Sequence, residues 1–416
     1  MSRKLNVYLC GIRIGILTED DLLQFSFQYD ASRTHDNAMP LSVRMPVRAE
    51  SYPHSLAYPF FENLTPEGEA FEILANDHVS GNKVFSILDR FGGDCAGAVA
   101  FYETIPNDDG ENLREISPAE MAQIIDKLPQ DPLLTGIDNP PRLSLAGAQS
   151  KFAVYKNEGK YYRSSEKYPT THIIKAANKR FSDLLKNELF CMRLAAIMQL
   201  NTPDVELMEA EGRQYLEVKR YDRRIGNIVH RIHQEDFCQA LGIVSGRKYQ
   251  AGGGAKLKEC YNIIDEFSEN RLTDTIRFME WVIFNYLIGN TDAHAKNLSL
   301  LHSDSGIRLA PFYDLLSTEV YPERVVDQEM AMLINGKGKY DSLNPEDFFA
   351  LFRHMGQNAT NMMKTVKDRF ADIALSAEKL KEGLPQDTSI YDEIIAIIKR
   401  RFTVLFASGR TRTCNL

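Results

Sequence analysis

The hydrophobic pattern of the sequence changes twice along the chain, and this limits the folds open to it. Residues 1–102 mix alternating stretches with short helix-like ones, and LNVYLCGIRIGIL around Cys10 and Gly11 is typical of a β-hairpin. From about residue 141, short apolar strands are separated by glycine and charged turns, with one helix-like piece, SDLLKNELFCMRLAAIMQL, among them. After about residue 232 the pattern is helical almost to the end. Together the patterns predict an α+β protein.

A polar stretch at residues 105–120, IPNDDGENLREISPAE, carries Pro, Gly and Asn and indicates a boundary between two parts of the chain. The 416 residues are enough for two or three packed units with a sizeable core. We therefore expect an N-terminal α/β subdomain at 1–107, a β-rich lobe at 108–228 and a helical lobe at 229–410.

The composition is that of an ordinary soluble globular protein, with 44% hydrophobic and 25% charged residues, which argues against a disordered chain. The net charge of −8 makes a main role in reading nucleic acid less expected. Six cysteines without CxxC spacing indicate reduced thiols. Because the sequence shows neither a secretory signal nor an apolar stretch of membrane-spanning length, we expect a cytoplasmic protein without a membrane partner.

The segment YLIGNTDAHAKNLSLLHSDSGIRLAPFYDLLS at 286–317 carries the clearest chemical signal. Asn297 follows Asp292 by five positions, and Asp314 lies 17 positions further on. Phosphoryl transfer from ATP needs one carboxylate to accept the hydroxyl proton, and a carboxamide with a second carboxylate to hold Mg²⁺. The catalytic loop of protein kinases has the same D-x-x-x-x-N spacing. Taken alone, the spacing also occurs by chance and fits a helix N-cap followed by a turn.

Other parts of a kinase site precede this segment in the expected order. Lys175 lies in the β-branched strand THIIKAA, where it could contact phosphate, and Glu188 follows on the predicted helix as an ion-pair partner. A strand lysine of this kind is also often a solvated surface residue. The small residues 146–149, followed by Lys151, could approach a polyphosphate or form a plain hairpin turn. We expect YLEVKRYDR at 215–223 to lead into the lobe connection, where backbone groups bind an adenine edge.

Taken together, the motifs resemble the HipA family of bacterial serine/threonine kinase toxins. The resemblance runs nearly end to end through PLSVRMPV, FFENLTPEGE, FGGDCAGAV, RLSLAGAQSKFAV, THIIKAA, VKRYDRR, HQEDFCQALG, YLIGNTDAHAKNLSLL, LAPFYDLLST and MAMLINGKGK. It implies a two-lobed, protein-kinase-like fold with an N-terminal subdomain, a β-rich nucleotide lobe and an all-helical C-terminal lobe.

The resemblance also implies roles for single residues. Asp292 matches the catalytic base, Asn297 and Asp314 match the metal ligands, and Lys175 matches the phosphate-contacting lysine that pairs with Glu188. The implied nucleotide-binding positions are Ala146, Gly147, Ala148, Gln149, Ser150, Lys151, Lys175, Lys219, Arg220, Tyr221, His294, Ala295, Lys296, Asn297 and Asp314.

Three positions need separate comment. Ser144 matches the serine that such kinases autophosphorylate, and a phosphate there would add about −1.5 to −2 charge beside a site meant for ATP, switching the enzyme off. Ser150 stands where the family loop often has Glu, which leaves the detailed contacts of the loop open. His294 is interpreted mainly as a structural hydrogen-bonding residue rather than a proton carrier.

The implied function is an ATP- and Mg²⁺-dependent serine/threonine protein kinase, the toxin of a type II toxin–antitoxin pair. Its implied partners are a helix-turn-helix antitoxin of HipB type, operator DNA contacted mainly through that antitoxin, and an aminoacyl-tRNA synthetase as substrate, the glutamyl enzyme in particular. Two alternatives stay open: a small-molecule phosphotransferase with the same Asp, Asn and Asp, and a catalytically silent nucleotide-binding corepressor or scaffold.

Overall fold

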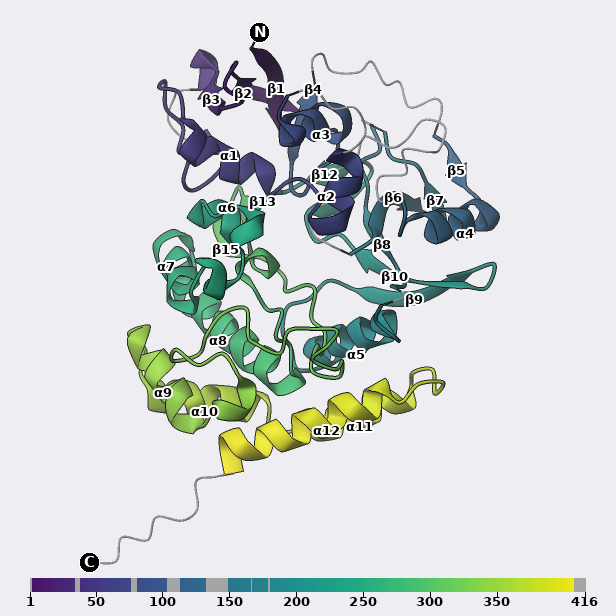
Figure 1. The fold of residues 1–416 in the computed structure, drawn as a ribbon, viewed down its shortest axis with the longest axis vertical. Helices are drawn as coiled ribbons and strands as arrows, with labels where there is room; N and C mark the ends of the chain where they lie inside the picture. Colours follow the sequence, from purple (N-terminus) through teal and green to yellow (C-terminus); the bar gives the residue numbers. More distant parts are fainter. Residues whose placement is uncertain are drawn as a thin grey trace, which may run out of the picture. The chain divides into compact units, whose positions relative to one another are not determined.

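The chain forms two compact units in the computed structural model (Figure 1). The structure describes residues 2–33, 38–75, 81–102, 113–131, 149–165, 167–178 and 180–407. Unit 1 consists of Met1–Asn178, Pro203–Arg247 and Ser299–Ala310. Unit 2 consists of Lys179–Thr202, Lys248–Leu298 and Pro311–Leu416. Because the chain passes between the units several times, neither unit is a single continuous stretch.

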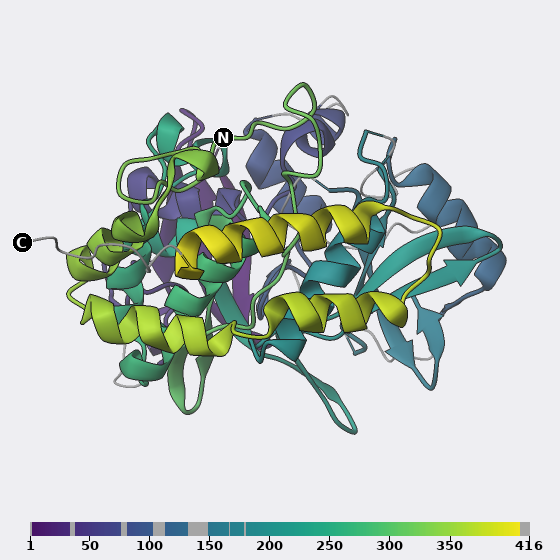
Figure 2. The same ribbon diagram turned by 90° about the horizontal axis from the view of Figure 1, so that it is seen from below.

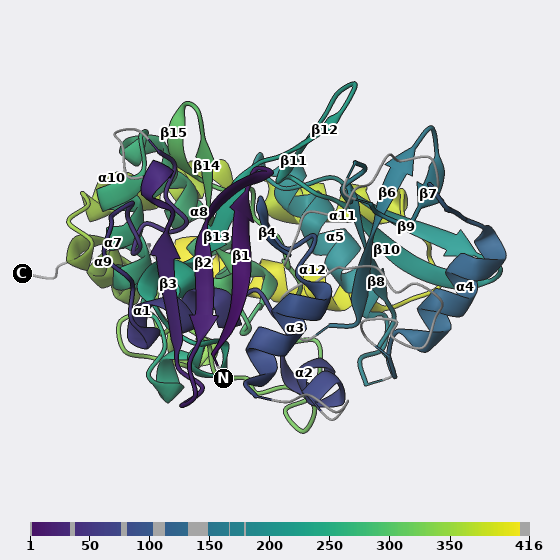
Figure 3. The ribbon, with the colours of Figure 1, turned by 90° about the horizontal axis from the view of Figure 1, so that it is seen from above.

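The first part of unit 1 is an antiparallel sheet in the order β3-β2-β1-β4, with β1 to β3 side by side in Figure 3. Its strands are β1 (Arg3–Leu9), β2 (Ile12–Glu19), β3 (Phe25–Tyr29) and β4 (Val99–Tyr102). The predicted hairpin is confirmed: Cys10 and Gly11 form its turn with φ of 52° and 77°, the left-handed conformation that such two-residue turns require. The helices α1 (His54–Glu62), α2 (Gly68–Ala75) and α3 (Lys83–Phe91) confirm the helical patterns that precede β4. Phe27, Phe61 and Phe101 are buried together in the core of this part.

The second part of unit 1 is a six-stranded sheet in the order β5-β7-β6-β8-β10-β9. Its strands are β5 (Glu115–Ile116), β6 (Lys151–Asn157), β7 (Lys160–Tyr162), β8 (His172–Ala176), β9 (Val205–Ala210) and β10 (Arg213–Lys219). The helix α4 (Pro118–Lys127) begins where the side chain of Ser117 accepts a hydrogen bond from the backbone N–H of Glu120, and Pro118 occupies the first turn. Ile124, Phe152 and Tyr215 join the helix and the sheet in one buried core. The strand-like patterns between residues 151 and 219 are thus confirmed.

The remaining elements of unit 1 correct part of the sequence interpretation. Strands β11 (Arg223–Ile225) and β12 (Val229–Arg231) form a hairpin, and β13 (His233–Asp236) pairs with the hairpin of β14 (Ser299–Ser303) and β15 (Gly306–Leu309). The expectation of helix from about residue 232 is wrong for HQED, which is a strand; helix α6 (Phe237–Leu241) starts only after it. The strand forms because it pairs with a segment more than 60 residues away, and local periodicity does not contain that partner.

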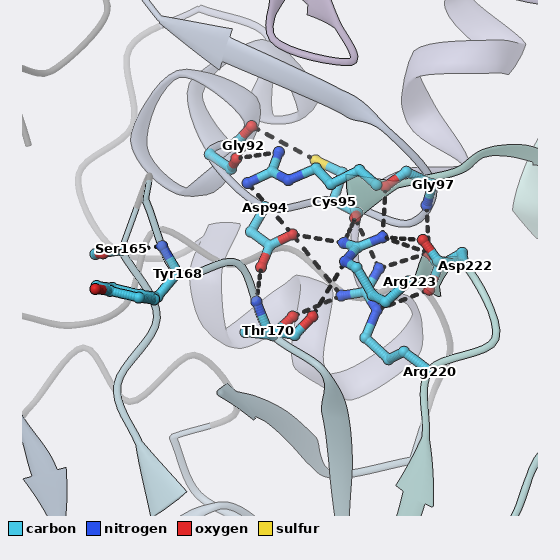
Figure 4. A network of polar contacts seen from close by, with 12 residues as sticks. Gly92, Asp94, Cys95, Gly97, Ser165, Tyr168, Thr170, Arg220, Asp222 and Arg223 are labelled. Atoms are coloured by element: carbon cyan, nitrogen blue, oxygen red, sulfur yellow. Dashed lines mark hydrogen bonds and ion pairs between the residues drawn. The ribbon is translucent and has the colours of Figure 1, made fainter. Parts of the chain in front are cut away.

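A buried ion-pair network joins the two parts of unit 1 (Figure 4). Asp94, which precedes β4, binds Arg223 and the backbone N–H of Thr170, which precedes β8. Asp222 binds Arg220 and Arg223, and its carboxylate also accepts the backbone N–H of Gly97. Because all of these charges are paired and hydrogen-bonded, they can stay ionised inside the protein.

Unit 2 is built from helices, with no sheet strand among its described residues. The helices are α5 (Leu184–Ile197), α7 (Leu257–Phe267), α8 (Arg271–Ile288), α9 (Pro345–His354), α10 (Ala359–Arg369), α11 (Ile373–Glu382) and α12 (Ile390–Phe402). Figure 2 shows α11 and α12 running alongside each other, and both pack on α5. The helices predicted for SDLLKNEL and for the C-terminal DEIIAIIKRRF are confirmed as α5 and α12.

The three-part division expected from the sequence stays a prediction. The first boundary, at residue 107, falls outside the described residues. Unit 1 combines the first two expected parts, except Lys179–Thr202, with strands β12 to β15 of the expected helical part. No helix among the described residues combines the length and apolar character that a membrane span needs.

Candidate active site

The loop that follows α8 carries the predicted catalytic residues. Gly289 ends α8 with φ of 73°, a left-handed cap that glycine adopts without steric cost. The backbone N–H of Thr291 donates to the hydroxyl of Thr318 at 2.7 Å, and the carbonyl of Gly289 accepts the N–H groups of Thr318 and Glu319, at 3.0 Å each. The start of the loop is therefore anchored to the segment that follows the FYD motif.

Asp292 projects from this loop with its side chain 45% exposed, so a substrate can reach its carboxylate. Its backbone N–H donates to the side chain of Asn290 at 3.1 Å, and its backbone carbonyl accepts Nδ2 of Asn297 at 3.1 Å. Nε2 of the buried His294 lies 4.0 Å from Oδ1 of Asp292. The backbone of the loop is thus fixed on both sides of the carboxylate.

The structure brings Asp314 to the same loop as Asp292 and Asn297. The hydroxyl of Tyr313 donates to the carbonyl of Lys296 at 2.6 Å, which ties the FYD motif to the loop. Asp314 is half-buried and has φ of 53°, a conformation uncommon for a residue with a side chain and one that gathers at functional sites. The 17-residue gap in the sequence is therefore closed in space.

Sequence reasoning missed Tyr249, whose hydroxyl donates to Oδ1 of Asp292 at 2.7 Å. Its ring also meets His294 edge to face, with centroids 5.7 Å apart. Tyr249 precedes Asp292 by 43 positions and belongs to no motif that the spacing of kinase residues marks. Local sequence carries no signal that would have identified it.

Lys175, the predicted phosphate-contacting lysine, lies in unit 1 on β8, an inner strand of the six-stranded sheet. Lys175 on β8 is 4% exposed and stands directly opposite Lys151 on β6. Residues directly opposite each other on paired strands have their side chains on the same face, so the two lysines lie on one face of the sheet. Nε2 of Gln149, just before β6, is buried with no hydrogen-bond partner among the described residues. These donors suit an anionic ligand.

The predicted connection at Lys219, Arg220 and Tyr221 begins at the end of β10. The guanidinium of Arg220 is buried and donates hydrogen bonds to the carboxylate of Asp222, to the hydroxyl of Thr170 and to the carbonyl of Cys95. Its side chain therefore serves the network of Figure 4. The contact predicted between the backbone groups of residues 219–221 and the adenine of a nucleotide stays a prediction.

The remaining predicted site residues divide into those that the structure describes and those that lie outside the described residues. His294, Ala295 and Lys296 are buried in the loop around Asp292, and Glu188 is buried on α5. Lys175 belongs to unit 1 and Glu188 to unit 2, so their ion pair stays a prediction. The predicted autophosphorylation and phosphate-loop residues Ser144, Ala146, Gly147 and Ala148 lie outside the described residues; Ser150 is described and half-buried.

The donor set of the loop fits a magnesium ion that is bound together with nucleotide. Nδ2 of Asn297 donates within the loop, so its amide oxygen is the atom that can serve a cation, and the carboxylate of Asp314 is the second oxygen donor predicted for it. Among the described residues, no group of three or more His, Cys, Asp or Glu could hold a metal ion. Mg²⁺ is usually bound by one or two carboxylates together with substrate phosphates and water, and two oxygen ligands on the protein are consistent with that.

The chain belongs to the HipA family. A family model described as HipA-like C-terminal domain matches residues 143–379, and one described as HipA N-terminal domain matches residues 5–102. The family is one of serine/threonine kinase toxins, and the α+β fold described above is that of a HipA-like kinase. The resemblance inferred from the motifs is thereby confirmed.

Individual relatives cover nearly the whole chain. This protein is 36% identical over 400 residues to the putative kinase Y4mE of Sinorhizobium fredii, and the match covers 93% of both chains. It is 28% identical over 405 residues to the serine/threonine-protein kinase toxin HipA of Shewanella oneidensis, covering 91% of both. A solved structure of Shewanella oneidensis HipA, with HipB and operator DNA, superimposes with a TM-score of 0.82 at 26% identity, covering 96% of this chain and 95% of the other.

Proposed function

We propose that this protein is an ATP- and Mg²⁺-dependent serine/threonine protein kinase that acts as the toxin of a type II toxin–antitoxin pair. The observation that carries the proposal is the assembly of Asp292, Asn297 and Asp314 around one loop, fixed by the hydrogen bonds from Asn297 to the Asp292 carbonyl and from Tyr313 to the Lys296 carbonyl. The opposed Lys151 and Lys175 support a phosphate-binding face in unit 1.

Each residue has a distinct task in this proposal. The exposed carboxylate of Asp292 accepts the proton of the acceptor hydroxyl as that oxygen attacks the γ-phosphate, and ADP leaves. Asn297 and Asp314 hold Mg²⁺, which neutralises phosphate charge when bound. Lys175, with Lys151 and Gln149, binds and orients the phosphates, because buried positive charge and N–H donors favour an anion in a low-dielectric site.

The proposal includes partners and regulation that rest on family membership. The related HipA of Shewanella oneidensis was solved with HipB and operator DNA. By this relationship, we infer that a small helix-turn-helix antitoxin of HipB type binds this protein and carries it to operator DNA. The net charge of −8 supports the antitoxin as the main DNA reader. We further propose an aminoacyl-tRNA synthetase, the glutamyl enzyme in particular, as substrate, and Ser144 as the autophosphorylated off-switch.

The test is phosphorylation of the purified protein by Mg-ATP, followed by intact-mass and peptide mass spectrometry. We expect the parent protein to gain a phosphate at Ser144, and Asp292→Asn to slow this gain by about 10²- to 10⁴-fold, because the proton acceptor is lost. The matched control is Asp304→Asn, which removes a carboxylate from the exposed turn between β14 and β15.

Three results would count against the proposal. Equal rates for Asp292→Asn and the parent would show that the base is elsewhere. A parent protein that binds ATP but never gains a phosphate would favour the scaffold alternative. Transfer of phosphate to small hydroxyl compounds, but not to protein, would favour the small-molecule phosphotransferase.

A further inference from the structure

Tyr249 is fixed against Asp292 by contacts that do not depend on its own hydroxyl. The backbone N–H of the next residue, Gln250, donates to the carbonyl of Ala331 at 2.8 Å, and the side-chain oxygen of Gln250 accepts the N–H of Leu333 at 2.8 Å. The N–H of Ala331 in turn donates to the carbonyl of Thr291, one residue before Asp292, at 2.8 Å. The backbones on the two sides of the contact are therefore joined through residues 331–333.

The phenol of Tyr249 reaches from this anchored backbone to one oxygen of the carboxylate. It donates to Oδ1 at 2.7 Å, a normal length for a hydrogen bond between a hydroxyl and a carboxylate. His294 lies on the same side, since its Nε2 is 4.0 Å from Oδ1. With Oδ1 occupied by the tyrosine, Oδ2 is the oxygen left to meet an acceptor hydroxyl. Tyr249 is itself 42% exposed, so the contact is open to a substrate from solvent.

We propose that Tyr249 is a positioning residue for phosphoryl transfer: its hydroxyl holds Oδ1 of Asp292 so that Oδ2 faces the acceptor hydroxyl. The proposal rests on the kinase function proposed above. In the step itself, the bond from the acceptor oxygen to the γ-phosphorus forms while the bond from that phosphorus to the bridging oxygen of ATP breaks. The acceptor proton passes to Oδ2 of Asp292 and ADP carries away the electron pair. Tyr249 stays protonated and takes no part in bond exchange.

The test compares Tyr249→Phe with the parent as full-length proteins. Two quantities are measured: the single-turnover rate of self-phosphorylation at saturating Mg-ATP, and the affinity for a fluorescent ATP analogue with Mg²⁺. We expect the rate to fall roughly 10- to 100-fold, because a hydrogen bond to a charged group is lost and the base is no longer held in one orientation. The affinity and the melting temperature should stay at the parent values, because Phe keeps the ring against His294 and the backbone anchors do not involve the hydroxyl.

A second variant separates positioning from plain structure. Replacement of Tyr249 by 4-aminophenylalanine puts an N–H donor where the hydroxyl was, and should restore most of the lost rate. Tyr261→Phe is the matched control: it also removes one tyrosine hydroxyl in unit 2, but that hydroxyl accepts from Gln357 at 3.0 Å, and we expect the parent rate.

The outcomes distinguish this inference from the proposed function. A parent protein without any phosphoryl transfer would refute the kinase function itself. An active parent with an equally active or faster Tyr249→Phe variant would refute positioning, and a faster one would show that the tyrosine blocks the acceptor place. The inference would likewise be overturned if 4-aminophenylalanine at position 249 failed to restore the rate. It would also be overturned if Tyr249→Phe lost nucleotide affinity by the same factor as it lost rate.

Discussion

Asp94→Asn tests whether the buried ion-pair network holds the two parts of unit 1 together. Oδ1 of Asp94 accepts from Arg223 at 2.7 Å, and Oδ2 accepts the backbone N–H of Thr170 at 2.8 Å. Arg231 and Arg220 lie 3.6 Å and 3.9 Å from Oδ1. Burial by itself would raise the pKa of Asp94, but the charges of the three arginines hold this pKa well below its usual range. The carboxylate is therefore ionised at neutral pH.

The magnitude follows from what the substitution leaves behind. Asn keeps the size of the side chain and removes its charge. The buried Arg220 and Arg223 then keep Asp222 as their carboxylate partner, and the half-buried Arg231 loses the charge of Asp94. Removing one partner of a buried ion pair costs about 3–5 kcal/mol, because the remaining charge is neither solvated nor neutralised. For a unit of this size, about 2–4 °C of melting temperature is lost per kcal/mol, which gives a decrease of roughly 10 °C.

Differential scanning calorimetry of the parent and of Asp94→Asn would measure this decrease. The control is Asp126→Asn, which removes the same group from the exposed pair of Asp126 with Arg213 on the surface of unit 1, and should leave the melting temperature nearly unchanged. The folded-state pKa of Asp94 is depressed, so its contribution to stability is present above about pH 4 and is lost in acid. Asp94→Asn should therefore differ less from the parent at pH 3 than at pH 7. Equal melting temperatures at pH 7 for parent and variant would refute the reasoning.

Two further substitutions test other parts of the fold. Burial lowers the pKa of His233 to about 3, so the unfolded chain takes up a proton that the folded chain does not. Unit 1 should therefore lose stability as pH falls from about 6.5 towards 3, and His233→Gln should reduce this loss. Urea unfolding midpoints of parent and variant across this pH range measure the effect. If the midpoints of both proteins change equally with pH, the lowered pKa of His233 is contradicted. Gly289→Ala would place a Cβ 2.6 Å from the carboxylate of Glu319, whereas Gly356→Ala has a similar positive φ and nothing within 4 Å. Gly356→Ala should lower the free energy of unfolding by about 1 kcal/mol, because alanine is strained at a positive φ. Gly289→Ala should lower it by about 1–3 kcal/mol more and should also reduce the rate of self-phosphorylation. Equal losses for the two variants in thermal unfolding would be inconsistent with the clash.

Some features of this protein were predictable because the information lies in neighbouring residues. The hairpin turn at Cys10 and Gly11, the helical periodicity of α5 and the spacing of Asp292 and Asn297 are all local patterns. In protein kinases the same spacing places a carboxylate and an amide on one loop. The fold class could therefore be inferred from the sequence, and the same local spacing predicts a catalytic loop at Asp292 and Asn297.

Other features depend on contacts between distant segments. Strand β13 exists because β14 pairs with it, and HQED by itself has no strand signature. Arg220 lies in the stretch whose backbone is predicted to contact adenine, and that contact stays a prediction. The buried contacts of its side chain with Asp222 and Thr170 have no signal in the local sequence. In each case the partner comes close only once the chain has folded, so local sequence patterns do not reveal it.

Tyr249 shows the same limit at the site itself, and it indicates how the site is organised. The tyrosine reaches Asp292 only because residues 331–333 hydrogen-bond to Gln250 and to Thr291 at once. That bridging segment belongs to MAMLINGKGK, a stretch shared with the HipA family that contains none of the predicted catalytic residues. Its role follows from the hydrogen bonds: it sets the distance between the anchored phenol of Tyr249 and the carboxylate of Asp292, the proposed proton acceptor. Substitutions that disturb residues 331–333 should then lower the rate of phosphoryl transfer. Part of that loss should disappear when Tyr249 is already Phe, namely the part that acts through Tyr249 rather than through the contact with Thr291.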